Sequence, residues 1–369
     1  MQFDRMIMEK EAPEEMGYDK IKYNLSESSI ADRTLADLGL DLNDLLLFYG
    51  DHSGIPELRN IIGKKYYGLG QDNVLVCAGA CMALFIVNAT ILSPEDQLLV
   101  VQPNYATNIE VPKSLSIGID LVALSLENEF KLDVEALEAC IQPETKLISV
   151  TYPHNPSGVV ISESDLMELI EVAERHGCYL LVDETYRELT FGKKLPTAAS
   201  LSSKAISVES VSKSFGIPGI RIGWVATQDP VLMERFLATK EQIVICNSVV
   251  DEQIAFEVLK QKEQLLAQTA GKNIENFEVV KKWMAGQDIL EWVEPSGGVV
   301  CFPRFKSNVD IDTDLFYQLL LEKYDTFVGP GRWFNETDRH FRIGYGWPTK
   351  EELTAGLDGI LSAARDSRR

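Results

Sequence analysis

Short apolar runs alternate with amphipathic stretches from residue 73 to about residue 182. The apolar runs read NVLVC, QLLVVQ, LVALSL, KLISVT and CYLLV, and helical patterns such as GACMALFIVNATIL and SESDLMELIEVAERHG separate them. Strands that are apolar along their whole length are typical of a parallel sheet that is buried on both faces. The pattern therefore predicts an α/β core, a large three-layer αβα domain with a mainly parallel sheet.

The pattern changes after about residue 230. Residues 230–285 read as long helices, and the remainder mixes short strands (GGVVCF, HFRIGY) with helices (DTDLFYQLLLEKY, TKEELTAGLDGILSAARD). This mixture predicts a second, smaller α+β domain. We expect residues 1–40 to form an N-terminal segment that joins the small domain, 41–265 to form the large domain, and 266–369 to form the C-terminal small domain.

Composition narrows the class of function. The chain has 369 residues, is 45% hydrophobic, and carries a net charge of −21, whereas nucleic acids and anionic membranes attract basic patches. No apolar stretch is long enough to span a bilayer, and the N-terminus lacks a signal-peptide pattern. Six cysteines, mostly within apolar runs and without a CxxC pair, favour free thiols in the reducing cytoplasm. We expect small-molecule substrates, and neither nucleic acid nor membrane as a partner.

The first candidate for chemistry is Lys213, in the stretch SVESVSKSFGIPGIRIGW. A lysine becomes a nucleophile, or forms an imine, when its amine loses its proton. The small neighbours Ser210, Ser212 and Ser214 leave room for a bound group. A plain lysine in a polar turn is the alternative interpretation of this stretch alone.

Three other motifs follow predicted strands. LVDETYREL places Asp183 just past an apolar strand with Tyr186 three residues later, and YPHNPSG places Asn155 beyond the preceding strand. Their spacing fits one strand–helix–strand unit, so both loops are expected at the same carboxyl-end edge of the sheet. In VCAGACMAL a helix begins near Ala80 and Cys81, where free backbone N–H groups favour an anion.

These groups suit a phosphorylated pyridine cofactor. A carboxylate such as Asp183 keeps a pyridinium nitrogen protonated, and Tyr186 and Asn155 can donate to a phenolate oxygen. A guanidinium such as that of Arg221, a hydroxyl such as that of Ser210 and the helix start suit a dianionic phosphate.

Taken together, SVSKSFGIPGIRIGW, YPHNPSG and VDETY resemble the class I/II pyridoxal-phosphate aminotransferases, which have fold type I. The motifs GACMAL, QPNYATN, YPHNPSG, VDETYREL, SVSKSFGIPGIRIGW and HFRIGY occur in the family's order over roughly residues 40–350. The resemblance implies pyridoxal 5'-phosphate (PLP) as cofactor, bound through a Schiff base on Lys213. It also implies that Asp183 contacts the pyridine nitrogen, and that Tyr186 and Asn155 contact the ring hydroxyl. The implied phosphate ligands are Ser210, Arg221 and the backbone amides of Ala80 and Cys81.

Three more residues take a role from the resemblance, each beside a plainer alternative. Tyr105, in QPNYATN, matches the aromatic residue that stacks on the cofactor ring, although it could be a core tyrosine. Tyr49 matches the tyrosine that reaches the phosphate of a neighbouring subunit, which implies a homodimer with shared active sites. An aromatic residue packed before a turn is the alternative for Tyr49. Arg342, in HFRIGYG, matches the clamp for the substrate α-carboxylate, although it could be an exposed strand residue.

The reaction that the resemblance implies is transfer of an amino group between an L-amino acid and a 2-oxo acid. The same ring chemistry also serves carbon–sulfur β-lyases, decarboxylases, cyclases and oxidases, which stay open as alternatives. A PLP-binding regulatory module is a remote alternative. That architecture needs a DNA-binding domain before the core, and the ~40 residues that precede the core here are too few for one.

The N-terminal stretch NLSESSIADRTL is where relatives usually shape the side-chain pocket. It departs from the glycine-containing segment of broad aspartate or aromatic aminotransferases, and its polar candidates are Ser26, Glu27 and Ser28. A Glu27 side chain that faced the cofactor would suit a cationic or amine-bearing substrate. The four histidines show no metal-ligand spacing, so no metal is expected, and surface solvation is expected for His52 and His154.

Overall fold

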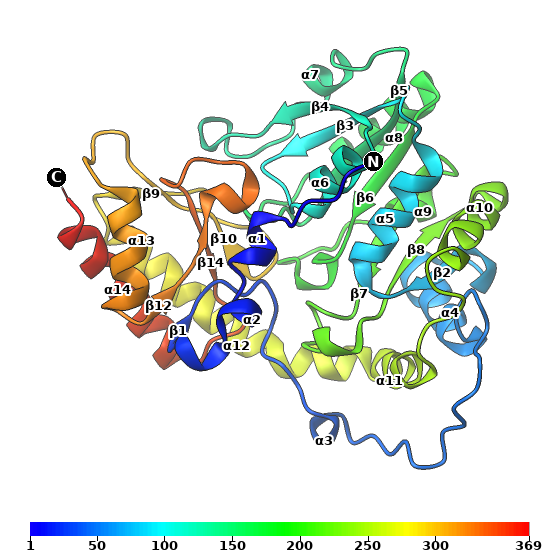
Figure 1. Ribbon diagram of the computed structural model, residues 1–369, viewed down its shortest axis with the longest axis horizontal. Coiled ribbons are helices and arrows are strands. Elements are labelled where there is room, and N and C mark those ends of the chain that lie inside the picture. The colour runs from blue at the N-terminus through cyan, green and yellow to red at the C-terminus, as the bar shows by residue number, and fades with distance from the viewer. Residues whose placement is uncertain (369) are drawn as a thin grey trace.

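The computed structural model describes residues 1–368, and its larger unit is built on a seven-stranded sheet (right in Figure 1). The strand order is β2-β8-β7-β6-β5-β3-β4. Neighbouring strands from β7 to β4 pair in parallel, whereas β8 pairs antiparallel with β2 and with β7. The mainly parallel sheet is therefore confirmed. The strands are β2 (Val74–Cys77), β3 (Gln97–Gln102), β4 (Gly118–Ala123), β5 (Thr145–Thr151), β6 (Tyr179–Asp183), β7 (Ala205–Ser210) and β8 (Gly223–Thr227).

Helices cover both faces of this sheet. Successive side chains of a strand point to opposite faces, so Leu98 and Val100 of β3 pack into one core while Leu99 and Val101 pack into another. The first face is covered by α5 (Gly79–Ile91), α6 (Thr107–Ser114) and α10 (Pro230–Glu241). The second face is covered by α4 (Pro56–Ile62), α7 (Val134–Glu138), α8 (Glu163–His176), α9 (Ala198–Leu201) and α11 (Val249–Lys260).

The smaller unit, at the left of Figure 1, has its own core. Its helices are α12 (Lys262–Ala285), α13 (Thr313–Glu322) and α14 (Lys350–Asp366). Its short strands are β9 (Leu290–Glu291), β10 (Val300–Cys301), β11 (Arg304–Phe305), β12 (Thr326–Phe327), β13 (Gly329–Pro330) and β14 (Phe341–Gly344). The N-terminal strand β1 (Tyr23–Asn24) pairs in parallel with β12. The boundary expected after residue 265 falls within α12, and the division of the chain into three parts stays a prediction.

The N-terminal segment lies where the two units meet, with α1 (Ile7–Lys10) and α2 (Pro13–Met16) near the centre of Figure 1. Glu11 holds it there, because its carboxylate accepts from Arg332 Nε at 3.1 Å and from Trp333 Nε1 at 2.8 Å. After α3 (Leu35–Leu38) the chain runs along the lower edge of the molecule to α4. Within residues 1–368 no helix is long and apolar enough to cross a membrane.

Candidate active site

A cavity of about 770 Å³ opens at the carboxyl ends of β5, β6 and β7, beneath the N-terminal segment. Ten of the eleven residues selected from the sequence line it, so the structure brings together motifs from both units. They are Ala80, Cys81, Tyr105, Asn155, Asp183, Tyr186, Ser210, Lys213, Arg221 and Arg342. The eleventh, Tyr49, lies in an exposed segment of the chain and does not line the cavity.

Asp183 ends β6 as a buried carboxylate, 4% exposed. Its Oδ1 atom accepts hydrogen bonds from Thr185 Oγ1 at 2.6 Å and from Thr185 N at 3.1 Å. Burial raises the pKa of Asp183, while the bonds from Thr185 and the charge of Lys213 lower it. A protonated ring nitrogen would offset that burial cost. Thr185 was not selected from the sequence, although it lies within the VDETY motif.

Gly79 and Arg221 shape an anion site at the start of α5. Gly79 has a φ of 82°, and a Cβ atom added there would lie 2.7 Å from Arg221 Nη2, so only glycine permits this approach of the guanidinium. No side chain caps this helix, which leaves the N–H groups near Ala80 and Cys81 open to a ligand. Ser210 ends β7 beside them and lines the same cavity.

Arg342 lies in β14 and is 4% exposed, so it is not an exposed strand residue. Its Nη1 donates to Asn155 Oδ1 at 3.0 Å and its Nη2 donates to the Ser26 carbonyl at 2.6 Å. Its Nε has no hydrogen-bond partner, and within residues 1–368 the guanidinium forms no salt bridge. Burial lowers the pKa of Arg342. A buried cation without an anion is costly, so this group calls for an anionic ligand.

Lys213 and two tyrosines complete the wall of the cavity. Lys213 is half-buried, its carbonyl accepts from Ile30 N at 3.2 Å, and its Nζ makes no hydrogen bond within the described chain. The Tyr105 hydroxyl lies 3.2 Å from Cys81 Sγ. Tyr186 is 4% exposed, and its hydroxyl makes no hydrogen bond to any residue between 1 and 368. The Lys213 amine and the hydroxyl of the buried residue Tyr186 are thus both available to a ligand.

The surface position expected for His154 is wrong. This residue is 1% exposed, its Nδ1 lies 2.7 Å from Ser157 Oγ, and its Nε2 lies 2.7 Å from the Pro103 carbonyl. Burial lowers the pKa of His154 to about 4, so the ring is neutral and structural. His52 is exposed and bonds Glu241 at 2.6 Å. Among residues 1–368 no group of three or more His, Cys, Asp or Glu could hold a metal ion.

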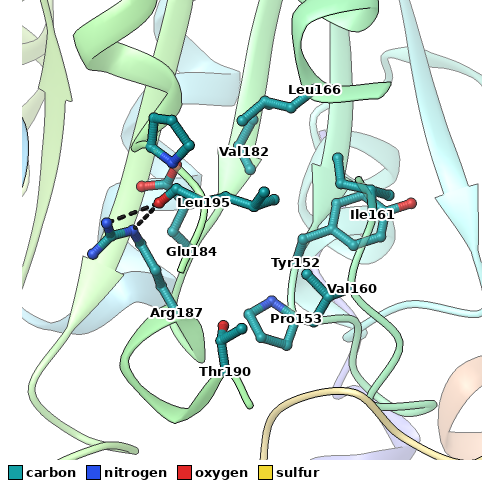
Figure 2. Close-up of a pocket in the computed structure, with 11 residues that line it drawn as sticks. Tyr152, Pro153, Val160, Ile161, Leu166, Val182, Glu184, Arg187, Thr190 and Leu195 are labelled. Atoms are coloured by element: carbon teal, nitrogen blue, oxygen red, sulfur yellow. Dashed lines mark hydrogen bonds between the residues drawn. The ribbon is translucent and has the colours of Figure 1, made fainter. Parts of the chain in front are cut away.

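A much smaller cavity of about 20 Å³ lies on the other side of β6 (Figure 2). Figure 2 shows Arg187 donating to the Leu195 carbonyl beside Glu184. Burial raises the pKa of Glu184 to about 7, and its Oε2 has no hydrogen-bond partner. The space fits about one water molecule, so it cannot hold an organic substrate.

The family model for aminotransferase class I and II matches residues 24–360. The chain belongs to this family. Among similar proteins, capreomycidine synthase of Streptomyces vinaceus is 28% identical over 93% of this chain and 90% of its own. Aspartate aminotransferase of Pyrococcus horikoshii is 28% identical over 85% of this chain and 82% of its own. The solved structure of a PLP-dependent aminotransferase from Streptococcus suis is 27% identical, with a TM-score of 0.92 and full coverage of both chains.

Membership of the family establishes fold type I and PLP as the cofactor. The residues of the large cavity fit this molecule on physical grounds. The buried Asp183 carboxylate suits a pyridinium nitrogen, and the Gly79 and Arg221 site suits a phosphate. The unbonded amine of Lys213 lies in the same cavity, as attachment to an aldehyde requires.

Proposed function

We propose that the protein is a PLP-dependent aminotransferase that moves an amino group between an L-amino acid and a 2-oxo acid. The observation that carries the proposal is the buried Arg342, which forms no salt bridge within residues 1–368 and shares one cavity with Lys213 and Asp183. A planar guanidinium binds a carboxylate through two parallel hydrogen bonds. An α-amino acid bound this way would present its α-carbon to the lysine.

When bound, PLP supplies a conjugated pyridinium ring that accepts the electron pair released at the substrate α-carbon. In the proposed mechanism, Asp183 holds the proton on the ring nitrogen, and Thr185 holds Asp183 in place through two hydrogen bonds. The Lys213 amine removes the α-proton as a general base and returns a proton later. The donor leaves as a 2-oxo acid without its amino group, and the acceptor 2-oxo acid leaves as an amino acid.

The other residues bind and orient. Tyr186 and Asn155 would donate to the ring oxygen, and the Tyr105 ring would offer an aromatic surface to the cofactor. Ser210, Arg221 and the start of α5 hold the phosphate. These roles belong to the proposal, and the shared cavity supports them.

Another PLP reaction is the second candidate, because one relative at 28% identity is named a synthase and another at 28% is named an aminotransferase. Arg342 serves any reaction in which the substrate keeps its α-carboxylate. The products separate the candidates. A carbon–sulfur lyase releases pyruvate and ammonia, a decarboxylase releases carbon dioxide, and a transaminase consumes a second oxo acid.

We also propose a cytoplasmic homodimer in which Tyr49 completes the partner's site. Leu46, Leu47, Phe48 and Tyr49 are all more than half exposed, an unusual apolar surface for a single chain. The test mixes Lys213→Ala and Tyr49→Phe subunits, each inactive or impaired alone. Shared sites predict recovered activity, because one site of each hybrid has both native residues. If the hybrids form and activity is not recovered, the sharing of active sites is refuted.

All six cysteines are free, as a reducing compartment favours.

The central experiment is a spectrum of the PLP-loaded protein, followed by an amino-acid screen. We expect visible absorbance from lysine-bound cofactor, its loss in Lys213→Ala, and its retention in the control Lys282→Ala, an exposed lysine of α12. Transamination predicts oxo-acid formation that depends on an acceptor oxo acid. Sustained product formation beyond one equivalent per active site without an acceptor would refute transamination, and absence of the cofactor absorbance in the wild type would refute the whole mechanism.

A further inference from the structure

Three carboxylates of the N-terminal segment line the reaction cavity: Glu9 of α1, Glu14 of α2, and Glu27 after β1. None of the three forms a salt bridge within residues 1–368. Burial and the charge of Glu14 raise the pKa of Glu9, while Lys213 and Arg221 lower it. These carboxylates therefore act on the same space as the reaction centre, and none of them is paired with a cation of the described chain in a salt bridge.

Within residues 1–368, Glu27 is the one of the three whose carboxylate accepts hydrogen bonds. The Leu25 amide donates to the Phe327 carbonyl at 2.8 Å, and the Gly344 amide donates to the Leu25 carbonyl at 2.7 Å, which fixes the backbone just before Glu27 against β14. Glu27 Oε1 accepts from Tyr18 Oη at 3.2 Å and from Asn24 Nδ2 at 3.4 Å. Its Oε2 has no donor within the described residues, so one carboxylate oxygen is available to a ligand.

Arg342 is evidence for an anionic ligand that does not depend on the three carboxylates, and binding at Arg342 would set the orientation of that ligand. The guanidinium is 4% exposed, its Nε is unpartnered, and the residue lines the cavity. Burial lowers the pKa of Arg342, an effect that the charges of Tyr186 and Glu27 partly oppose, and the adjoining Ser26 carbonyl accepts from Arg342 Nη2 at 2.6 Å. A substrate with its α-carboxylate on Arg342 and its α-carbon at Lys213 therefore lies in a cavity that the Glu27 carboxylate also lines.

The rest of the wall suits an aliphatic chain of some length. Met82, Phe85, Val111 and Met8 give the cavity apolar surface. Glu14, Tyr18 and Glu27 also bound an adjoining cavity of about 440 Å³, whose lining adds the carboxylate of Asp32 and the guanidinium of Arg33. An aliphatic stem against apolar residues with its charged end at a carboxylate is how long cationic side chains are usually accommodated.

We infer that the preferred amino-acid substrate has a long side chain ending in a cation, an ammonium or a guanidinium, recognised by Glu27. Glu9 and Glu14 are exposed at the opening and add negative potential that favours entry of a cation. This inference rests on the proposed function, because it takes Arg342 and Lys213 as the fixed points of the substrate.

The test compares substrates that differ in charge but hardly in shape. Arginine and citrulline form one pair, and lysine and norleucine form the second, which separates a guanidinium from an ammonium. We expect kcat/KM to favour the cationic member by on the order of tenfold or more, since hydrogen bonds to charged groups are the strong ones. Added salt should reduce this preference, because it screens the charges at the opening.

The decisive variant is Glu27→Gln, which keeps the shape and one acceptor oxygen. We expect it to lose most of the preference for arginine and to keep its kcat/KM for citrulline. Glu15→Gln is the matched control, because Glu15 lies in α2 next to Glu14 but pairs with Arg5 and does not line the cavity. A charge preference that survives in Glu27→Gln, or that is absent from an active wild type, would overturn the inference.

A binding measurement separates this inference from the proposed function. The deamino analogues of arginine and citrulline keep the carboxylate but cannot react, and their Kd values for the PLP-loaded protein report recognition alone. We expect tighter binding of the cationic analogue, and equal Kd values would overturn the inference. If this preference holds while no amino acid is turned over, the proposed function fails and the inference stands.

Discussion

Replacing Arg342 by lysine tests the proposed carboxylate clamp most directly. Lysine keeps the positive charge but loses the planar fork, and its shorter reach cannot satisfy both Asn155 Oδ1 and the Ser26 carbonyl, which now accept at 3.0 Å and 2.6 Å. Both acceptors are buried, since Asn155 is 3% exposed and Ser26 is 2% exposed. The substitution therefore affects both stability and substrate binding, by amounts that differ.

For stability, one buried acceptor left unpaired costs about 1–3 kcal/mol. For catalysis, the amino-acid carboxylate loses one of two charge-assisted hydrogen bonds, each worth about 1.5–3 kcal/mol. Since about 1.4 kcal/mol corresponds to tenfold, kcat/KM for the amino acid should fall by roughly ten- to a hundredfold. Of the proposed cofactor contacts only Asn155 bonds Arg342, so the Arg342→Lys protein should still show the absorbance of lysine-bound PLP.

The assay measures the transfer of the amino group from the donor to the enzyme, which is the first half of the reaction. The donors are the best amino acid and the corresponding amine, which lacks the α-carboxylate. The wild type should strongly prefer the amino acid, and Arg342→Lys should lose that preference while its slow reaction with the amine is unchanged. Arg339→Lys is the matched control, because Arg339 precedes β14 but donates to the backbone carbonyls of Phe305, Lys306 and Val309, outside the cavity.

Equal losses of kcat/KM for the amino acid and the amine in a folded Arg342→Lys protein would refute the clamp, because they would show a general disturbance of the site. A wild-type preference that persists in the variant would refute it as well. Thermal unfolding of both variants establishes that the comparison is made between folded proteins.

Three other substitutions follow from the site. Gly79→Ala should weaken PLP binding by roughly tenfold or more, since it strains a φ of 82° and places a methyl group against Arg221. The control is Gly68→Ala, at a φ of 63° with no atom within 4 Å of the added methyl group, which should leave the Kd for PLP unchanged. Asp183→Asn should lower kcat by on the order of a hundredfold or more while PLP still binds, because an amide cannot keep the ring nitrogen protonated; near-native turnover would contradict the role of Asp183. For Glu184, burial raises the pKa from 4.5 to about 7, so the unfolded chain loses this proton at lower pH than the folded chain. The free energy of unfolding therefore falls as the pH rises from about 4.5 to about 7. Glu184→Gln should remove that fall, gaining up to about 3 kcal/mol over the wild type near pH 8 in urea titrations, and an identical pH profile would contradict it.

Much of the fold could be predicted from local pattern. The central strands β3, β5 and β6 carry buried apolar residues on both faces, and this pattern is visible in the sequence because each residue's burial follows from its position in a parallel sheet covered on both sides. Helix α8 was equally clear, since Ser162 and Asp165 form a capping box at its start and Gly177 ends it at a φ of 73°. Such signals act within a few residues, so sequence alone reveals them.

The order of the motifs also predicted which residues would meet, because the carboxyl ends of parallel strands share one edge. Asn155, Asp183 and Ser210 follow or end the adjacent strands β5, β6 and β7 and line one cavity. By contrast, Tyr49 is absent from that cavity, and its role in a partner's site stays a prediction.

Contacts between distant segments needed the tertiary structure. The bond from Arg342 to Asn155 joins residues 187 positions apart, and Arg342 also reaches the Ser26 carbonyl across 316 positions. Nothing in the pattern around Glu9 or Glu14 indicated that α1 and α2 would lie over the reaction centre, because no apolar period marks those short helices. His154 was expected at the surface for the same reason: its burial depends on Pro103 and Ser157 closing around it, and the packing of separate loops leaves no local trace. Local sequence sets the elements and their order, whereas charge neutralisation and burial arise only when segments far apart in the chain pack together.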